Sequence, residues 1–167
     1  MSQHAFGLDM KKGLYIGIFD PITLGHMDII ERAAKLVDQL VIGVVVDSIV
    51  PTEIDLEDRI RLVNKVMVSY NNVHIVEYDG RFGKIIAEND INIMIRGLRM
   101  MTDFENELNI VHTTSQMYYS FDTIFLCTNE IYANYSAREV RQIARNHGEV
   151  APFLPECIVE DVKSIYA

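Results

Sequence analysis

Two short stretches of the chain combine residue types that bind phosphate groups. The first is a turn rich in helix breakers, residues 19–26 (FDPITLGH), which follows an apolar run and precedes an amphipathic segment. A strand that passes through such a turn into a helix gathers free backbone N–H groups and the positive end of the helix dipole at one place. His26 would lie in the first helical turn, where it could donate a hydrogen bond to the same phosphate.

The second stretch contains two arginines. Arg96 and Arg99 lie three residues apart, between a predicted strand at residues 92–95 and a predicted helix. Guanidinium groups present planar pairs of donors that suit phosphate oxygens, so the pair predicts a site for a polyanion. Ordinary surface pairing with Asp103 or Glu105 would also explain two such arginines.

The elements that carry these residues alternate between strand and helix. Apolar or alternating runs predict strands at residues 14–18, 40–46, 73–78, 92–95 and 123–126. Helical periodicity predicts helices over residues 25–37, 55–70, 84–89, 102–119, 136–147 and 155–162. This alternation is typical of an α/β fold with a doubly wound five-stranded parallel sheet. Ligands bind such sheets beyond the carboxyl ends of the strands, and the turns after the first, fourth and fifth strands carry the candidate chemistry.

Helix starts are marked by capping patterns. Asp55 is expected to cap the second helix. Thr102 with Glu105, and Ser136 with Glu139, have the spacing of capping boxes. Ser136 could therefore serve as a cap, as a ligand contact, or as both.

Composition limits the kinds of function. The formal net charge of −9 argues against a nucleic-acid-binding surface, which requires a basic patch. Cys127 and Cys157 cannot make a disulfide framework and indicate a reducing compartment. No apolar run approaches the roughly 20 residues of a membrane span. The N-terminus also lacks the apolar core of a secretory signal. We expect a cytoplasmic protein without nucleic-acid or membrane partners.

The length of 167 residues predicts a single domain. We place this domain at residues 13–167. Residues 1–12 are interpreted as an N-terminal extension or a cloning remnant, because Met10-Lys11-Lys12 would make a plausible native start.

Three separated blocks of the sequence resemble a known family. Residues 17–26 (GIFDPITLGH) resemble the (T/H)xGH signature of the nucleotidylyltransferase superfamily, and within it they are most similar in sequence to phosphopantetheine adenylyltransferases. The resemblance continues through residues 95–108 (IRGLRMMTDFENEL) and 148–156 (GEVAPFLPE). It implies a Rossmann-like nucleotidylyltransferase fold. It also implies adenylyl transfer from ATP to 4′-phosphopantetheine, which gives dephospho-coenzyme A and pyrophosphate.

The resemblance also implies roles for individual residues. The catalytic residues would be His26, Arg96 and Arg99. The residues that bind ATP would be Ile18, Phe19, Gly25, His26, Gly97, Leu98, Arg99, Glu107, Tyr132, Ser136 and Arg138. The residues that bind the acceptor would be Ile18, Val50, Phe82 and Arg96. A solvated helix face would also explain Glu107, and simple packing would also explain Tyr132.

The implied ligands are ATP, 4′-phosphopantetheine and coenzyme A. No cage of carboxylates for a metal ion is evident in the sequence, so Mg²⁺ is expected to arrive with ATP. By resemblance the protein would be a homo-oligomer, specifically a hexamer.

Several positions depart from the family pattern. Ile18 stands where the family usually has Thr or Ser, Val50 stands where it has Lys, and Ala137 and Arg138 replace two hydroxyl residues. Arg138 itself, or Arg81 and Lys84, could restore positive charge. Two alternative functions therefore remain: a paralog that binds nucleotide or coenzyme A without turnover, and a nucleotidylyltransferase with another phosphorylated acceptor.

Overall fold

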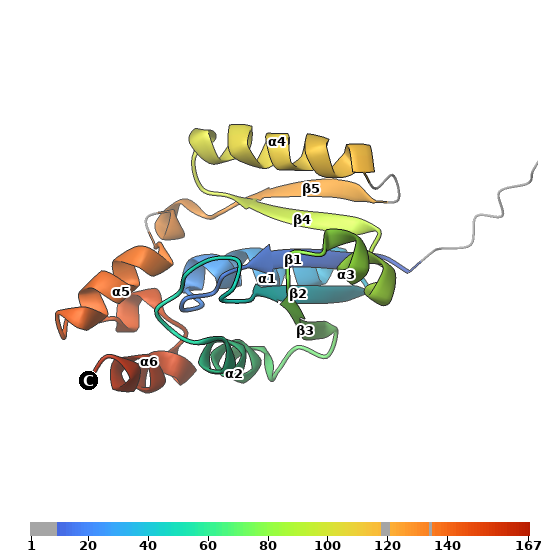
Figure 1. The fold of residues 1–167 in the computed structure, drawn as a ribbon. Helices are drawn as coiled ribbons and strands as arrows, with labels where there is room; N and C mark the ends of the chain where they lie inside the picture. The colour runs from blue at the N-terminus through green and yellow to red at the C-terminus, as the bar shows by residue number, and fades with distance from the viewer. Residues whose placement is uncertain (1–9, 118–120, 134) are drawn as a thin grey trace, which may run out of the picture.

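The computed structural model describes residues 10–117, 121–133 and 135–167 and contains a five-stranded parallel sheet between two layers of helices (Figure 1). The strands are β1 (Lys12–Gly17), β2 (Gln39–Val45), β3 (Val73–Tyr78), β4 (Ile93–Leu98) and β5 (Asp122–Cys127). Their order in the sheet is β3-β2-β1-β4-β5, so β1 is the central strand. This topology confirms the predicted doubly wound α/β fold.

The helices cover both faces of the sheet. They are α1 (Leu24–Leu36), α2 (Leu56–Met67), α3 (Phe82–Asn89), α4 (Met101–Met117), α5 (Ala137–Arg145) and α6 (Val159–Ile165). Short 3₁₀ turns occur at Glu130–Tyr132, Ala151–Phe153 and Glu156–Ile158. The larger apolar cluster joins the sheet to α1, α2, α5 and α6, and a smaller cluster joins it to α3. The layers explain why β1 and β2 are apolar on both faces: Leu14 belongs to the smaller cluster and Tyr15 to the larger.

Strand β4 is longer than the sequence predicts. The expected end of this strand at residue 95 is wrong, because Arg96, Gly97 and Leu98 continue the strand. The reason is the pairing: β4 aligns with β1 only over Ile93–Ile95, but it pairs with β5 along its full length. Successive residues therefore face opposite sides of the sheet beyond the end of the β1 pairing.

Most of the predicted helix starts are confirmed. The Asp55 carboxylate accepts a hydrogen bond from a backbone N–H in the first turn of α2, and Ser136 forms a capping box with Glu139 at the start of α5. Helix α4 begins at Met101, one residue before the cap position predicted for Thr102, and the Thr102 side chain of the predicted capping box lies outside the described part. The Asp103 carboxylate accepts hydrogen bonds from the two backbone N–H groups that precede the helix.

The N-terminal extension expected over residues 1–12 is described only from residue 10, and residues 1–9 lie outside the described part. Lys12 is already the first residue of β1.

Candidate active site

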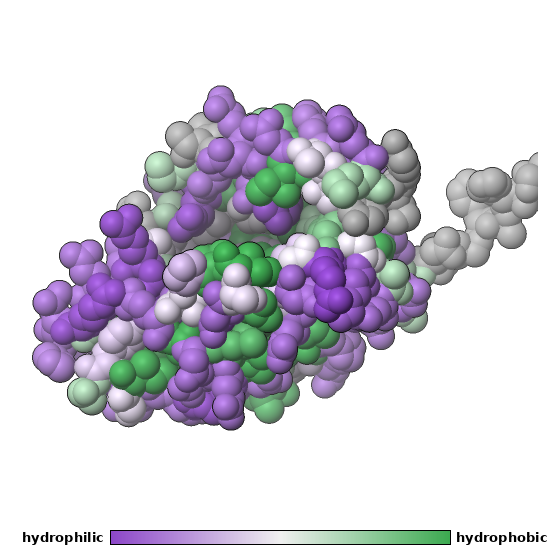
Figure 2. All heavy atoms as spheres, in the orientation of Figure 1, coloured by the Kyte–Doolittle hydropathy of each residue, from purple (hydrophilic) through white to green (hydrophobic). Residues whose placement is uncertain are grey.

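The carboxyl edge of the sheet holds a cavity of about 610 Å³. Its walls come from the end of β1 and the turn after it, the loop after β2, the end of β4, the residue after β5 and the start of α5. Figure 2 shows this face hollowed between the α4 layer and the loops below it. The three turns with candidate chemistry therefore meet around one space, as the topology of a parallel sheet requires.

Most of the predicted site residues line this cavity. They are Ile18, Phe19, Gly25, His26, Val50, Arg96, Gly97, Arg99, Glu107, Ser136 and Arg138. Three others lie beside it. Leu98 lines a neighbouring apolar hollow, Phe82 lines a second cavity, and the Tyr132 ring packs edge-on against Tyr135.

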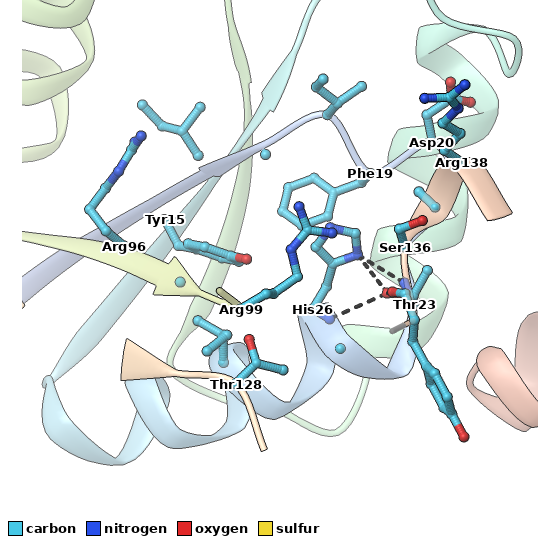
Figure 3. Close-up of a pocket in the computed structure, with 18 of the residues that line it drawn as sticks. Tyr15, Phe19, Asp20, Thr23, His26, Arg96, Arg99, Thr128, Ser136 and Arg138 are labelled. Carbon is cyan, nitrogen blue, oxygen red and sulfur yellow. Dashed lines mark hydrogen bonds between the residues drawn. The ribbon is translucent and has the colours of Figure 1, made fainter. Parts of the chain in front are cut away.

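His26 uses one ring nitrogen to hold the turn together. The Thr23 backbone N–H donates to Nδ1 of His26 at 3.0 Å, and the Thr23 hydroxyl oxygen lies 3.0 Å from the same nitrogen (Figure 3). Because Nδ1 accepts a hydrogen bond, the proton of the neutral ring lies on Nε2. Nε2 is therefore the nitrogen available to donate to a ligand.

The environment keeps this imidazole neutral. Burial, with a further contribution from the Arg99 guanidinium, lowers the pKa of His26 to about 4. Figure 3 shows the Arg99 side chain reaching toward the His26 ring. At neutral pH the site therefore presents a neutral N–H donor beside a permanent cation.

The start of α1 supplies further donors. Thr23 caps the helix, and its hydroxyl oxygen accepts from the His26 backbone N–H at 3.4 Å. Within the described hydrogen bonds, the backbone N–H groups of Leu24 and Gly25 are left for a ligand. A Cβ on Gly25 would lie 3.5 Å from two backbone carbonyl oxygens, which is ordinary contact. The fold itself therefore does not require glycine here.

The two predicted arginines have different partners. Arg96 forms an ion pair with Glu107, and both side chains are largely buried. Arg99 lies 3.7 Å from the Asp103 carboxylate, and its side chain is 48% exposed. The alternative of surface pairing with Asp103 or Glu105 thus holds for Arg99, which has a loose contact with Asp103. It does not hold for Arg96, whose partner is Glu107. Arg99 remains free to turn toward an anion.

Arg138 is the better placed of the proposed replacement cations. It lines the cavity at the start of α5, and its side chain has no ion-pair partner among the described residues. Its charge helps to lower the pKa of the neighbouring Glu139 carboxyl, although hydrogen bonds from the helix cap lower it more. Arg81 and Lys84 do not line the cavity, and both contact Asp79.

A network of polar contacts that no sequence motif indicates joins the signature turn to α5. The buried Asp20 carboxylate accepts from the backbone N–H groups of Glu53 at 3.1 Å and Ile54 at 3.0 Å. Arg141 donates to the Asp20 backbone carbonyl at 2.5 Å and to the Glu53 carboxylate at 2.9 Å. No motif marks Arg141, because its partners come from distant parts of the chain.

A fully buried arginine was also missed. Arg59 on α2 donates to the carbonyl oxygens of Ile18 at 2.6 Å, Val45 at 2.8 Å and Ile54 at 3.0 Å, and it forms an ion pair with Asp47. It therefore fixes the ends of β1 and β2. It also fixes the loop after β2, which forms the lower wall of the cavity through Val50 and Pro51. An arginine in an amphipathic helix is usually assigned to the solvent face, so no local pattern marks Arg59 as buried.

The donor set does not fit a protein-bound metal ion. Among the described residues, no group of three or more His, Cys, Asp or Glu side chains could hold one. The acids nearest the cavity are already engaged: Asp20 accepts backbone hydrogen bonds and Glu107 pairs with Arg96.

Comparison with known proteins identifies the family. A family model described as cytidylyltransferase-like matches residues 14–143. The phosphopantetheine adenylyltransferase of Lachnoclostridium phytofermentans is 38% identical over 157 residues, which is 94% of this chain and 96% of that protein. The chain belongs to the phosphopantetheine adenylyltransferase family. The member from Synechococcus sp. (strain WH7803) is also 38% identical, over 93% of this chain and 94% of its own length.

A solved structure supports the fold. The Vibrio parahaemolyticus protein assigned as a nicotinate-nucleotide adenylyltransferase superposes with a TM-score of 0.70 at 14% identity, covering 94% of this chain and 96% of that chain. In the described part of this family member, no helix has the length and apolar character needed to cross a membrane.

Proposed function

We propose that the protein transfers the adenylyl group of ATP to 4′-phosphopantetheine, giving dephospho-coenzyme A and pyrophosphate. The observation that carries this proposal is the family membership over almost the whole chain, at 38% identity to named members. The cavity adds a consistent geometry, since donors and cations for phosphate groups surround one space at the carboxyl edge of the sheet.

The nucleotide would bind over the start of α1. Nε2 of His26 and the free backbone N–H groups there would donate to the phosphates, and Arg99 and Arg138 would supply positive charge. Ser136 caps α5 at the same cavity, so its position suits both roles that the sequence left open.

The acceptor would bind beside it. A second cavity of about 230 Å³ adjoins the first, and Ile16 and Arg96 line both. Its other walls are mainly apolar and include Phe82, Met94 and Ile110. Arg96 would hold the acceptor phosphate at the boundary, and the uncharged arm would extend along the apolar walls.

The reaction needs no protein nucleophile. An oxygen of the acceptor phosphate attacks the α-phosphorus of ATP in line, the bond to the bridging oxygen breaks, and pyrophosphate leaves with the electron pair. The protein contributes positioning and charge stabilisation. His26 would donate to an oxygen of the α-phosphate, and Arg99 would stabilise the charge that develops there.

The decisive test is a two-substrate assay. Pyrophosphate should form only when MgATP and 4′-phosphopantetheine are both present, and mass spectrometry should detect dephospho-coenzyme A. Pyrophosphate release with ATP and a different phosphorylated acceptor, but none with 4′-phosphopantetheine, would contradict the proposed acceptor.

Other expectations from the sequence stay predictions. We infer that Mg²⁺ enters as part of the MgATP substrate and that coenzyme A occupies the same cavities. A homo-oligomer, with six subunits by resemblance, would cover the exposed apolar side chains of α4, such as Ile110 and Met117. The cytoplasmic location rests on the sequence alone.

A further inference from the structure

Tyr15, on the central strand, has a hydroxyl group that the fold does not use. The side chain is 8% exposed, and within the described residues no hydrogen bond to its hydroxyl is found. Among the described residues no fully buried side-chain nitrogen or oxygen lacks a partner, so this unpaired hydroxyl is accessible from the cavity. Tyr15 lines the main cavity, where a ligand could supply that partner.

The ring of Tyr15 is explained by packing, but its hydroxyl is not. The ring belongs to the larger apolar cluster and contacts Phe19 edge-on at 5.9 Å between centroids. A phenylalanine would make the same ring contacts. The hydroxyl therefore has no role in the fold among the described contacts.

A small niche surrounds this hydroxyl. A Cβ on Gly97 would lie 3.6 Å from the Tyr15 hydroxyl oxygen and 3.2 Å from the Ile29 side chain. A side chain at position 97 would therefore crowd Ile29 and cover the hydroxyl, and the glycine keeps the hydroxyl uncovered on this side. Figure 3 shows the Tyr15 ring reaching from β1 toward the end of β4 that carries Arg99.

The charges near the niche favour an electron-rich ligand atom. The guanidinium groups of Arg96 and Arg99 both act on Tyr15, and the opposing carboxylate of Glu107 is paired with Arg96. Burial raises the pKa of Tyr15 to about 12, so the hydroxyl keeps its proton and can donate. An oxygen atom that accepts a hydrogen bond is the complementary group.

We propose that the Tyr15 hydroxyl donates a hydrogen bond to an oxygen of the ribose-phosphate part of bound ATP. This inference rests on the proposed function and adds a nucleotide contact outside the signature turn. The acceptor is either a ribose hydroxyl or a phosphate oxygen, since both present the same chemistry to the niche.

The test is Tyr15→Phe, with ATP affinity measured by calorimetry in the absence of the acceptor. The variant should bind ATP about tenfold more weakly, while its Tm stays unchanged. Repeating the titrations with 2′-deoxy-ATP and 3′-deoxy-ATP locates the contact. If the loss of affinity in Tyr15→Phe disappears with one analogue, the contact is to the ribose hydroxyl that this analogue lacks. If the loss persists with both analogues, the contact is to a phosphate oxygen.

The matched control is Tyr70→Phe, which removes a tyrosine hydroxyl at the opposite edge of the sheet, where the neighbouring Glu31 carboxylate helps burial to raise the pKa of Tyr70. This control should bind ATP like the wild type. ATP affinity of Tyr15→Phe within twofold of the wild type would overturn the inference alone, and so would a loss of Tm without a loss of affinity. A wild-type protein that binds no ATP would overturn the proposed function as well.

Discussion

His26 serves the fold with one ring nitrogen and the site with the other. Nδ1 accepts from the Thr23 backbone N–H and so closes the first turn of α1. The same contact leaves Nε2 as a donor of known direction, next to Arg99. A donor held in place before the reaction stabilises developing charge without reorganisation.

Replacing His26 should therefore affect turnover more than binding. In His26→Ala we expect kcat to fall by about 100-fold, as for the loss of one preorganised donor, while ATP affinity changes much less. Steady-state kinetics and calorimetry measure the two effects. His74→Ala, which removes an exposed histidine from β3, is the control. Unchanged turnover in His26→Ala would contradict the role of His26.

The low pKa of His26 also predicts a pH effect on stability. The folded protein binds this proton only near pH 4, whereas the unfolded chain binds it near pH 6.5. The unfolded state therefore holds more protons between these values, and stability falls as the pH decreases through this range. The free energy of unfolding of the wild type, measured in urea, should fall toward that of His26→Gln as the pH drops from 6.5 to 4. A constant difference between the two proteins would contradict the assignment.

At the scale of elements, α2 organises the lower wall of the cavity although none of its side chains lines it. Arg59 reaches from this helix to the carbonyl oxygens at the ends of β1 and β2 and in the following loop. Asp20 then fixes the same loop from the other side through two backbone N–H groups. Val50 is thus held at the cavity by buried polar contacts around it.

Removing Arg59 should destabilise the protein strongly. Arg59→Met leaves three carbonyl oxygens without their donor, and we expect a loss of about 3 kcal/mol or more in the free energy of unfolding. Urea denaturation measures the loss. Arg61→Met on the same helix breaks only exposed ion pairs with Asp58 and Asp161 and should change little by comparison. Equal effects of the two substitutions would contradict the structural role of Arg59.

The sequence predicted elements better than it predicted contacts between them. Apolar or alternating runs revealed all five strands, because the burial of a strand shapes its local composition. The extension of β4 to Leu98 could not be read locally, since pairing with β5 determines it. Arg59, Arg141 and Tyr15 were missed for a related reason. Their roles depend on partners that only the folded chain brings near.

At the scale of the whole molecule, the cavity joins the first part of the chain to the last. Its walls combine β1 and the signature turn with α5, and Arg141 contacts Asp20 across 121 positions of sequence. A ligand in this space would touch both parts at once. Binding should therefore stabilise the global fold and not one segment alone.

This predicts a thermal shift with nucleotide. At about 100 times its Kd, ATP adds about 2.7 kcal/mol to the free energy of unfolding, which corresponds to a rise of roughly 5 to 10 °C in Tm for a chain of this size. Differential scanning calorimetry measures the shift. Adenosine, which lacks the phosphates, should give a much smaller rise, and equal shifts for both ligands would contradict a phosphate-centred site.

The central position of β1 has a consequence for how the protein is made. The ribosome delivers this strand before its two neighbours, β2 and β4, and α5 follows all five strands of the sheet. A nascent chain that stops before residue 136 could complete the sheet yet would lack one wall of the cavity. Nucleotide could then engage fully only after α5 has been synthesised, which separates folding of the scaffold from the onset of activity.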